Sequence, residues 1–588
     1  MSPNAVFEVS WEVCNKVGGI YQVVKSKAEF LKKRYQTYVV IGPYFEKQAQ
    51  FEFQQKPAPA AYQHAFDELR NEGIVCVYGT WQIKGEPDAI LINFQNAQID
   101  MNAVKKELWD RYQVDSIFAH GDYDEPLRWS WAAGKLIEKL AAGMQGKTVA
   151  HCHEWLSGFT LLYLRSRCPN VGTVFTTHAT MLGRTMCGSG RELYGALGTF
   201  DPAQMARELG VSEKFTMERA CANYAHVFTT VSKITGLEAE HLLGKKPDIL
   251  LLNGLDDTKF PTFEEASILH QKNREKVRDF LEFYFFSHYT FDMDETLILF
   301  ITGRFEFKNK GLDVLIRALG RLNDTLRQEG SKKTVVAFFW IPNEVHGIKT
   351  ELLEEKGVFN HIKSYVEENS HDFTRRILRN APSIKAYSCK DLLSEEFVKT
   401  IQRQMESLKH PGNPPLVTHN IPSEEQNPII ANLRAVGLDN AADDPVKAIF
   451  YPVYLTGSDG LLDLQYNDAV SGCHLGVFPS YYEPWGYTPV ESMAFGVPAV
   501  TTDLAGFGLF IEPHAGSGIH VLKRLGRSDD QVTEDLFHML HEYAKKDKFG
   551  RNEEKTHAKA LTKLTDWATF ITYYFQAHKL AAERSSNQ

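Results

Sequence analysis

The sequence lacks the features that direct a protein into a membrane, out of the cell or onto nucleic acid. No window reaches the roughly eighteen uninterrupted apolar residues of a membrane span, and no basic segment followed by an apolar one opens the chain. The eight cysteines have no regular spacing, which excludes a disulfide framework. A net charge of −9 excludes a general attraction to nucleic acid or anionic lipid. We therefore expect a cytoplasmic protein with neutral or small partners, no nucleic acid and no membrane.

The composition is that of a large globular protein. With 588 residues, 43% of them hydrophobic and 24% charged, the chain exceeds what one hydrophobic core usually serves. Short apolar runs alternate with amphipathic stretches, which is typical of doubly wound parallel α/β sheets. The runs that predict strands are Val6–Val9, Tyr38–Ile41, Thr148–His151, Thr173–Thr176, Val227–Val231 and Ile249–Leu252, then Leu297–Ile301, Val335–Trp340, Ala448–Tyr451, Leu475–Pro479 and Ala499–Thr501. Two α/β domains follow one another.

The domain boundaries follow from the interruptions of this alternation. We predict an N-terminal Rossmann-like domain over residues 1–255, a C-terminal Rossmann-like domain over 256–560, and a final helix within 561–588 that packs back on the first domain. The region about 343–418 has helical periodicity and separates two strands. It predicts a helical insertion in the second domain that serves as an oligomerisation arm.

The most informative segment runs from Phe478 to Pro498, a strand, a tight loop and a helix. Thr488 is a candidate N-cap, with Pro489 at the first helical position and Glu491 completing a capping box. The helix N-terminus after Gly486 is equally a candidate phosphate site. Glu483 lies among aromatic residues at the carboxyl end of a strand, where open α/β sheets place their ligands, and this favours a functional carboxylate over a solvated one.

A second loop, from Ile301 to Gly311, presents Arg304 and Lys310 after a strand. Two cations at this position suit a diphosphate leaving group, whose developing charge they would neutralise without a metal. The alternative is a pair of ordinary surface cations.

Three further segments carry weaker signals. In Lys16-Val-Gly18-Gly19, the paired glycines let the backbone approach a ligand. His151 and His153 share one face of a strand that Cys152 cannot join, which argues against a zinc site and favours His153 and Glu154 as cleft residues. His178 and Arg184 follow another strand at the same rim, with a core histidine as the alternative for His178.

The pair Asp292 and Asp294 formally fits the metal-binding Asp-x-Asp of metal-dependent glycosyltransferases. It precedes its strand rather than following it, so we expect it at the wrong end of the second sheet. We predict no metal site and no cofactor.

Taken in order, these motifs resemble those of the glycogen synthase family of animals and fungi. The spacing of Glu483 and Glu491 is similar to the paired glutamates of retaining GT-B glycosyltransferases, and Lys16-x-Gly18-Gly19 resembles the donor loop of glycogen and starch synthases. The resemblance implies a GT-B fold, two Rossmann-like domains facing a cleft. It also implies metal-independent, retaining transfer of glucose from UDP-glucose to the 4-hydroxyl of glycogen, a tetramer built through the helical insertion, and a possible priming protein.

The resemblance also assigns roles to residues. Arg304 and Lys310 would hold the diphosphate, Glu483 the glucosyl hydroxyls, and His178 and Arg184 the sugar site; Tyr466 would stack on the base. We take Glu483, Arg304, Lys310 and His178 as the catalytic set. The expected substrate- and nucleotide-binding residues are Lys16, Gly18, Gly19, His153, Arg184, Asn253, Tyr466, Trp485, Gly486, Tyr487, Thr488 and Glu491. With one strong carboxylate, Glu483, front-face attack is favoured over a covalent intermediate.

Departures from the family concern regulation. The arginine-rich helix with which the family senses glucose 6-phosphate corresponds here to Lys548–Lys559, and most of its arginines are gone. This departure argues against the classical control by glucose 6-phosphate and favours a bacterial or otherwise simplified member of the family. Among enzymes, the alternatives are another GT-B glucosyltransferase and an ADP-glucose-dependent synthase. The alternative from a different class is an inactive glycogen-binding scaffold.

Overall fold

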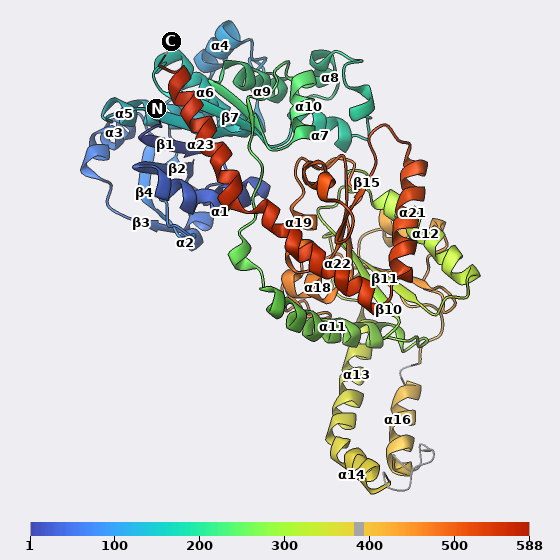
Figure 1. Cartoon of the computed structure of the whole chain (residues 1–588). Coiled ribbons are helices and arrows are strands. Elements are labelled where there is room, and N and C mark those ends of the chain that lie inside the picture. The colour runs from blue at the N-terminus through green and yellow to red at the C-terminus, as the bar shows by residue number, and fades with distance from the viewer. Residues whose placement is uncertain (1, 381–392, 408, 587–588) are drawn as a thin grey trace.

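The computed structural model describes residues 2–380, 393–407 and 409–586 as two α/β domains (Figure 1). The first domain holds a nine-stranded sheet in the order β3-β4-β5-β2-β1-β6-β7-β8-β9. Its strands are β1 (Ala5–Val9), β2 (Thr37–Pro43), β3 (Phe53–Gln55), β4 (Val75–Trp81), β5 (Asp88–Asn93), β6 (Thr148–His153), β7 (Gly172–Thr177), β8 (Val227–Thr230) and β9 (Ile249–Leu250). Its helices are α1 (Gly19–Arg34), α2 (Glu46–Glu52), α3 (Ala60–Asn71), α4 (Met101–Tyr112), α5 (Asp124–Ala142), α6 (Glu154–Arg167), α7 (Met181–Gly188), α8 (Pro202–Glu208), α9 (Ser212–Tyr224) and α10 (Lys233–Leu242).

The second domain holds a six-stranded parallel sheet in the order β12-β11-β10-β13-β14-β15. Its strands are β10 (Thr296–Thr302), β11 (Thr334–Trp340), β12 (Val446–Phe450), β13 (Leu475–Val477), β14 (Ala499–Thr502) and β15 (Ile519–Leu522). Around it lie α11 (Phe263–Phe285), α12 (Leu312–Gln328), α17 (Pro428–Ala435), α18 (Tyr466–Gly472), α19 (Tyr487–Ala494), α20 (Gly506–Ile511), α21 (Asp529–Lys545) and α22 (Lys548–Leu561).

The central strands of both sheets are buried along their whole length because helices cover both faces. Every residue of β11 is buried, as is every residue of β6. The α/β prediction with parallel sheets is confirmed for these strands. The edge of the first sheet differs, since β4 runs antiparallel to both β3 and β5. The sequence prediction missed these three strands. Strand β3 and the first half of β4 are partly exposed, whereas residues 89–92 of β5 form a buried apolar run that the prediction overlooked.

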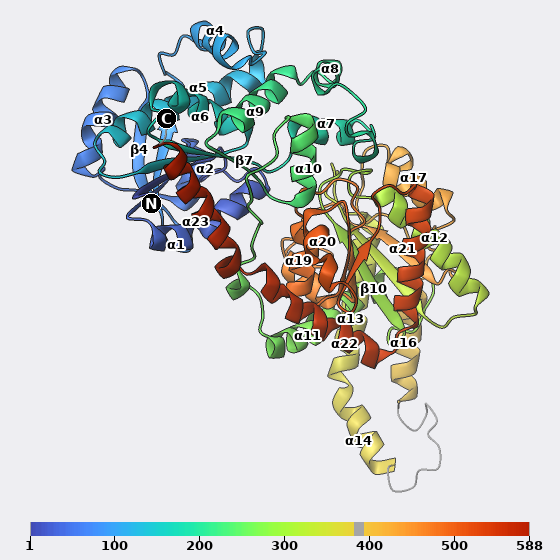
Figure 2. The same ribbon diagram turned by 45° about the horizontal axis from the view of Figure 1, so that its top comes forward.

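Three helices leave the second domain as an arm, α13 (Thr350–Glu368), α14 (Ser370–Asn380) and α16 (Glu395–Ser407). They lie within the predicted insertion, and Figures 1 and 2 show them projecting from the body of the domain. The ring of Phe397 on α16 stacks on Tyr365 of α13 at a centroid distance of 5.4 Å. The arm is therefore held together by its own aromatic contacts.

The chain crosses between the domains twice, and the two crossings lie side by side. Leu255 on the outward crossing donates its N–H to the carbonyl of Thr565 on the return, at 2.8 Å. Gly254 lies against Trp567, where a Cβ would come within 2.5 Å of the indole. The last helix, α23 (Trp567–Arg584), then packs on the first sheet, with Gly172 of β7 against Ala581 (Figure 1). Among the described residues, no helix has the length and apolar character needed to cross a bilayer.

Candidate active site

The carboxyl ends of β10 and β13 bring Lys310 and Glu483 together. Lys310 Nζ lies 2.5 Å from Glu483 Oε2, and both side chains are mostly but not fully buried. Lys310 comes from the loop after β10, and Glu483 from the loop after β13. An ion pair at the carboxyl edge of a parallel sheet occupies the position where this type of fold binds ligands.

The close approach of these two loops depends on Gly311. Its φ of +68° lies in the left-handed region, and a Cβ there would come within 2.0 Å of the carbonyl oxygen of Pro479. Only glycine satisfies both conditions. The glycine therefore sets the distance between the loop of Lys310 and the loop of Glu483.

Helix α19 begins differently from the sequence prediction. Its N-cap is Gly486, with φ of +97°, and no side chain caps it. The predicted capping box of Thr488 and Glu491 is wrong, because Thr488 lies inside the first turn. Without a capping side chain, the first N–H groups of α19 are available to an anion.

Glu491 takes part in a different contact. Its Oε2 accepts a hydrogen bond from Tyr466 Oη at 3.2 Å. Burial raises the pKa of the Glu491 carboxyl to about 7, although the Tyr466 hydrogen bond opposes this. Tyr466, the first residue of α18, thus joins the same wall as α19, together with the buried hydroxyl of Tyr487, which has no described hydrogen-bond partner.

The structure does not bring the side chain of Trp485 to this pair. The indole is buried against Phe507 and Phe510, and its ring centroid lies 6.1 Å from that of Phe570 on α23. It contributes to the contact between the second domain and the final helix. Asn253 is likewise buried at the crossing between the domains, and its Oδ1 has no described partner.

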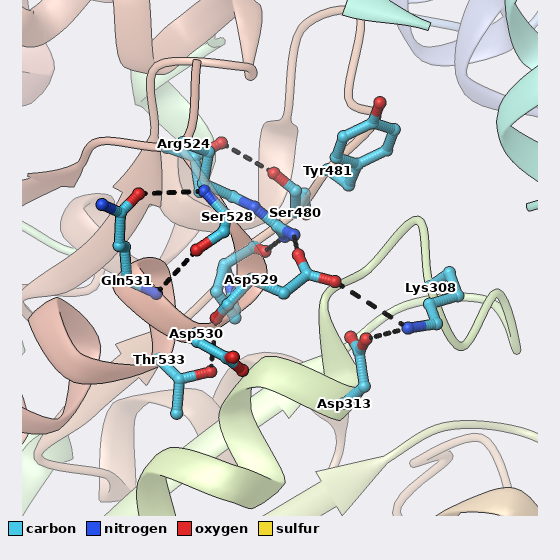
Figure 3. A network of polar contacts seen from close by, with 12 residues as sticks. Lys308, Asp313, Ser480, Tyr481, Arg524, Ser528, Asp529, Asp530, Gln531 and Thr533 are labelled. Atoms are coloured by element: carbon cyan, nitrogen blue, oxygen red, sulfur yellow. Dashed lines mark hydrogen bonds and ion pairs between the residues drawn. The ribbon is translucent and has the colours of Figure 1, made fainter. Parts of the chain in front are cut away.

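Behind the Glu483 loop lies a polar network centred on the buried Arg524 (Figure 3). Its guanidinium donates to the carbonyl of Pro479 at 2.6 Å and to Asp529 at 2.9 Å, and lies over the ring of Tyr481. Lys308, from the loop of Lys310, lies 3.9 Å from the same Asp529. The network therefore braces both loops from one side, and sequence reasoning missed it.

The first domain contributes the loop of Lys16, Gly18 and Gly19, all exposed. Glu12, which sequence reasoning also missed, accepts the N–H groups of Gly18 at 2.8 Å and Tyr21 at 2.7 Å. A Cβ on Gly18 would come within 3.0 Å of this carboxylate, whereas Gly19 has open space. The carboxylate therefore fixes the loop, and the close approach concerns Gly18.

Two arginines from different domains face this loop. Burial raises the pKa of Glu12, and the hydrogen bonds from Tyr21 and Gly18, followed by the charges of Arg184 and Arg304, oppose the rise. Arg184 of the first domain and Arg304 of the second are thus both near enough for their charges to act on Glu12. Arg304 is 64% exposed and pairs with Glu306 at 2.9 Å, so it is available at the rim rather than bound to Glu483.

The histidines lie beneath this rim. His178, just after β7, is hydrogen-bonded through Nε2 to Nδ1 of His153 at 2.9 Å. Glu154, at a left-handed φ of 63°, accepts the N–H groups of His178 and Ala179. His153 is fully buried and reaches the cleft only through His178.

One contact joins the domains directly across the cleft. Tyr482, next to Glu483, donates to Glu238 of α10, which also accepts from Thr180 and Tyr194. Burial raises the pKa of the Glu238 carboxyl to about 7. The hydroxyl of Tyr481 accepts the N–H of Leu193 at 3.0 Å. The Glu483 loop is thus held against the first domain.

Away from the cleft, a cavity of about 860 Å³ lies between α11 and α22. Arg274, Arg551 and Lys555 line it, and among the described residues none of the three has a carboxylate within salt-bridge distance. Burial, followed by the charges of Arg274 and Arg551, lowers the pKa of Lys555 to about 6. Basic side chains gathered without carboxylate partners are suited to an anion, whose charge would favour the protonated form of Lys555. Sequence reasoning considered only α22 and missed the contribution of α11.

Two groups of side chains resemble metal sites, a pair of aspartates and a cluster of one glutamate with two histidines. Asp292 and Asp294 lie on the exposed loop before β10, at the opposite end from Lys310, and Asp294 pairs with Arg278. Glu8, His151 and His153 have ligand atoms close together, but the buried ammonium of Lys27 is bonded to Glu8. A cation already present on the carboxylate does not fit a metal centre.

Comparison with known proteins places these features in context. A family model described as glycogen synthase matches residues 8–588. The glycogen [starch] synthase of Neurospora crassa is 37% identical over 593 residues, covering 99% of this chain and 84% of that protein. The liver glycogen [starch] synthase of Homo sapiens is 35% identical over 587 residues, covering 99% and 84%. Among solved structures, the catalytic domain of starch synthase IV from Arabidopsis thaliana bound to ADP and acarbose has a TM-score of 0.53 at 14% identity, covering 99% of this chain and 100% of that one.

Proposed function

Since the chain belongs to the glycogen synthase family, it is a glycosyltransferase of glycogen biosynthesis with the GT-B fold, and we propose that it uses UDP-glucose as donor, retains the α configuration and needs no metal. The acceptor is the non-reducing 4-hydroxyl of an α-1,4-glucan. The observation that carries this proposal is the ion pair of Lys310 and Glu483 at the carboxyl edge of the second sheet, where the loop of Glu483 also carries Tyr482, which is hydrogen-bonded to Glu238 of the first domain.

The cations of this cleft take the role that a metal plays in other transferases. Lys310 and Arg304 neutralise the charge that develops on the departing diphosphate, and the uncapped N–H groups of α19 add donors. The departing phosphate accepts the proton of the attacking hydroxyl in a front-face reaction. Glu483 orients the glucosyl group while its charge is balanced by Lys310. The hydrogen bond between Tyr482 and Glu238 joins the two domains beside Glu483, and closure of the domains around the donor would exclude water from the reaction.

The decisive experiment measures glucose incorporation into glycogen from UDP-glucose and from ADP-glucose, each in EDTA. We expect transfer from UDP-glucose, undiminished by the chelator. The variant Glu483→Gln should lower turnover about 100-fold or more with UDP affinity nearly unchanged, because the carboxylate acts on the sugar and not on the nucleotide. Asp294→Asn, a carboxylate at the opposite end of β10, is the matched control and should retain full turnover. Transfer from ADP-glucose alone would overturn the donor assignment, and inactivity with both donors would favour the scaffold.

We also infer that the basic cavity between α11 and α22 binds a phosphate-bearing effector. The family senses glucose 6-phosphate through its arginine-rich helix, and here Arg274 of α11 supplies a cation beside the fewer cations of α22. Support comes from the three cations with no described carboxylate partner. Addition of glucose 6-phosphate to the transfer assay tests the inference, with binding measured separately by calorimetry.

We further propose that copies of the chain assemble through the arm. The projecting arm of α13, α14 and α16 supports a homo-tetramer in which copies meet through these helices (Figure 2). Light scattering of the full chain measures this state. A requirement for a priming protein is tested by starting the reaction without glycogen.

A further inference from the structure

A chain of buried hydrogen bonds runs from the core of the first domain to His178. It begins at Glu8 in the middle of β1, whose carboxylate accepts from Lys27 of α1, from Tyr38 of β2 and from His153 Nε2, the last at 2.7 Å. His153 Nδ1 then meets His178 Nε2 at 2.9 Å. The side chains of Glu8, Lys27 and His153 are all fully buried. A buried charged group on the way to a cleft histidine is not explained by the transfer reaction described above.

The first step concerns the protonation of Glu8. Three donors converge on its two oxygens, and an ionised carboxylate is the only form that accepts from all of them. Burial raises the pKa of Glu8, but the charge of Lys27 and the hydrogen bond from His153 more than reverse this and hold the pKa well below its usual value. An ionised carboxylate has no proton to give. His153 Nε2 must therefore carry the proton of their hydrogen bond.

The second step extends this proton assignment along the chain of hydrogen bonds to the other nitrogen of His153. His153 is buried beside the ammonium of Lys27, and burial lowers its pKa despite the hydrogen bond to Glu8. A neutral imidazole with a proton on Nε2 has a bare Nδ1, which can only accept. The proton between the two rings therefore belongs to His178 Nε2.

The third step concerns the other nitrogen of His178. Burial lowers the pKa of His178 well below its usual value, so the ring is neutral and Nδ1 is bare. No residue in the described ranges is hydrogen-bonded to this nitrogen, and the side chain is 8% exposed at the rim after β7. The atom presented to the cleft is an acceptor.

We propose that Glu8, held in place by Lys27, acts through His153 as a positioning residue that fixes His178 as the Nε2–H tautomer, so that Nδ1 accepts a hydrogen bond from a hydroxyl of the transferred glucosyl group. This inference rests on the proposed sugar site at His178. Glu8 does not touch the substrate, but its carboxylate determines which partner donates the proton in one hydrogen bond between His178 and the substrate. A hydroxyl donor is selected and an acceptor at the same position is rejected, because the bare nitrogen repels a second lone pair.

The neighbouring histidine provides an internal control. His151 lies on the same face of β6 and stacks on His153 at 4.3 Å, but its nitrogens are bonded to His578 of α23 and to Thr176. It is equally buried and has no bond to His178. Its replacement perturbs the same core, including the stacking on His153, without removing any hydrogen bond between Glu8 and His178.

The tautomer itself is measured on the wild-type full chain. Protein labelled with ¹⁵N in its histidine rings gives separate signals for bare and protonated nitrogens, and the His178 signals are those that disappear in His178→Asn. We expect a bare Nδ1 and a protonated Nε2. A protonated Nδ1 overturns the proposal, whether or not the protein transfers glucose, so this result is independent of the proposed function.

The consequence for catalysis is measured with UDP-glucose and its four single-deoxy analogues. The double variant Glu8→Gln with Lys27→Met removes the charge pair together and leaves an amide that can donate or accept, so the tautomer is no longer imposed. We expect kcat/KM for UDP-glucose to fall about tenfold, the worth of one hydrogen bond. The loss should vanish with the one analogue that lacks the hydroxyl bonded by His178.

A control variant separates a general effect on the core from an effect on one hydrogen bond. His151→Gln should lower kcat/KM by the same factor with every donor, since it acts only through the stability of the core. If the double variant also loses the same factor with all five donors, Glu8 serves folding alone and the proposal fails. Should the double variant not fold, His153→Gln is measured against the same donors, with the same expected pattern.

Discussion

Replacement of Arg524 tests how far the Glu483 loop depends on a residue outside the cleft. Arg524 is 5% exposed and makes three contacts, with the carbonyl of Pro479, with Asp529 and with the ring of Tyr481 (Figure 3). Methionine keeps an unbranched apolar side chain at this position and removes all three contacts. The carbonyl of Pro479 then loses its donor in the interior, which costs about 1–3 kcal/mol. The cation–π contact adds about 1 kcal/mol.

The loss of stabilising free energy at Asp529 is smaller, because its side chain is 47% exposed and Lys308 remains close to it. We therefore expect Arg524→Met to destabilise the second domain by about 2–4 kcal/mol. Because Pro479 immediately precedes the loop of Glu483, we also expect turnover per folded molecule to fall about 10- to 100-fold. UDP affinity should change less than turnover. Urea unfolding and the transfer assay measure the two effects.

Arg317→Met is the matched control. Arg317 pairs with Asp530 at the start of the same helix α21, but Asp530 is 91% exposed. A surface pair of this kind is worth about 0–1 kcal/mol, and the variant should keep full turnover. If Arg524→Met loses stability while each folded molecule transfers glucose at the normal rate, the network supports the fold only and the reasoning is refuted.

Three more outcomes follow from the structure. Gly311→Ala should lose far more stability than Gly330→Ala in urea unfolding: both glycines have positive φ, but only a Cβ at Gly311 meets a backbone oxygen. Equal losses would exclude the close approach as the cause. Glu238 keeps its proton to about pH 7 when folded but loses it near pH 4.5 when unfolded, so stability falls between these values and stays low above them. Glu238→Gln should flatten this fall between pH 5 and 8, and an unchanged slope contradicts the buried carboxyl. Lys555→Met should weaken glucose 6-phosphate binding in calorimetry without changing basal transfer, whereas unchanged affinity would place the anion elsewhere.

Much of the fold was predictable because parallel strands covered on both faces are buried and mostly apolar. The strands β6, β7, β10 and β11 were found on this signal, and the loops at their carboxyl ends pointed to His178, Arg304 and Lys310. The short, partly exposed strand β3 lacks that signal, whereas the buried apolar run of β5 was overlooked. The capping box at Thr488 was wrong because the local pattern says nothing of Gly486, whose left-handed conformation starts α19 earlier.

Short-range patterns by themselves determined the fold class, the order of the motifs and the rim on which the chemistry lies. Only the tertiary structure decided which residues meet. Glu8 and His153 are 145 residues apart, and Lys310 and Glu483 are 173 apart. Such contacts depend on the order of strands in a sheet and on how the two domains face each other. Burial then shifts the pKa values of ordinary side chains such as Glu238 and Lys555, because desolvation acts on the folded chain and leaves no mark in the sequence.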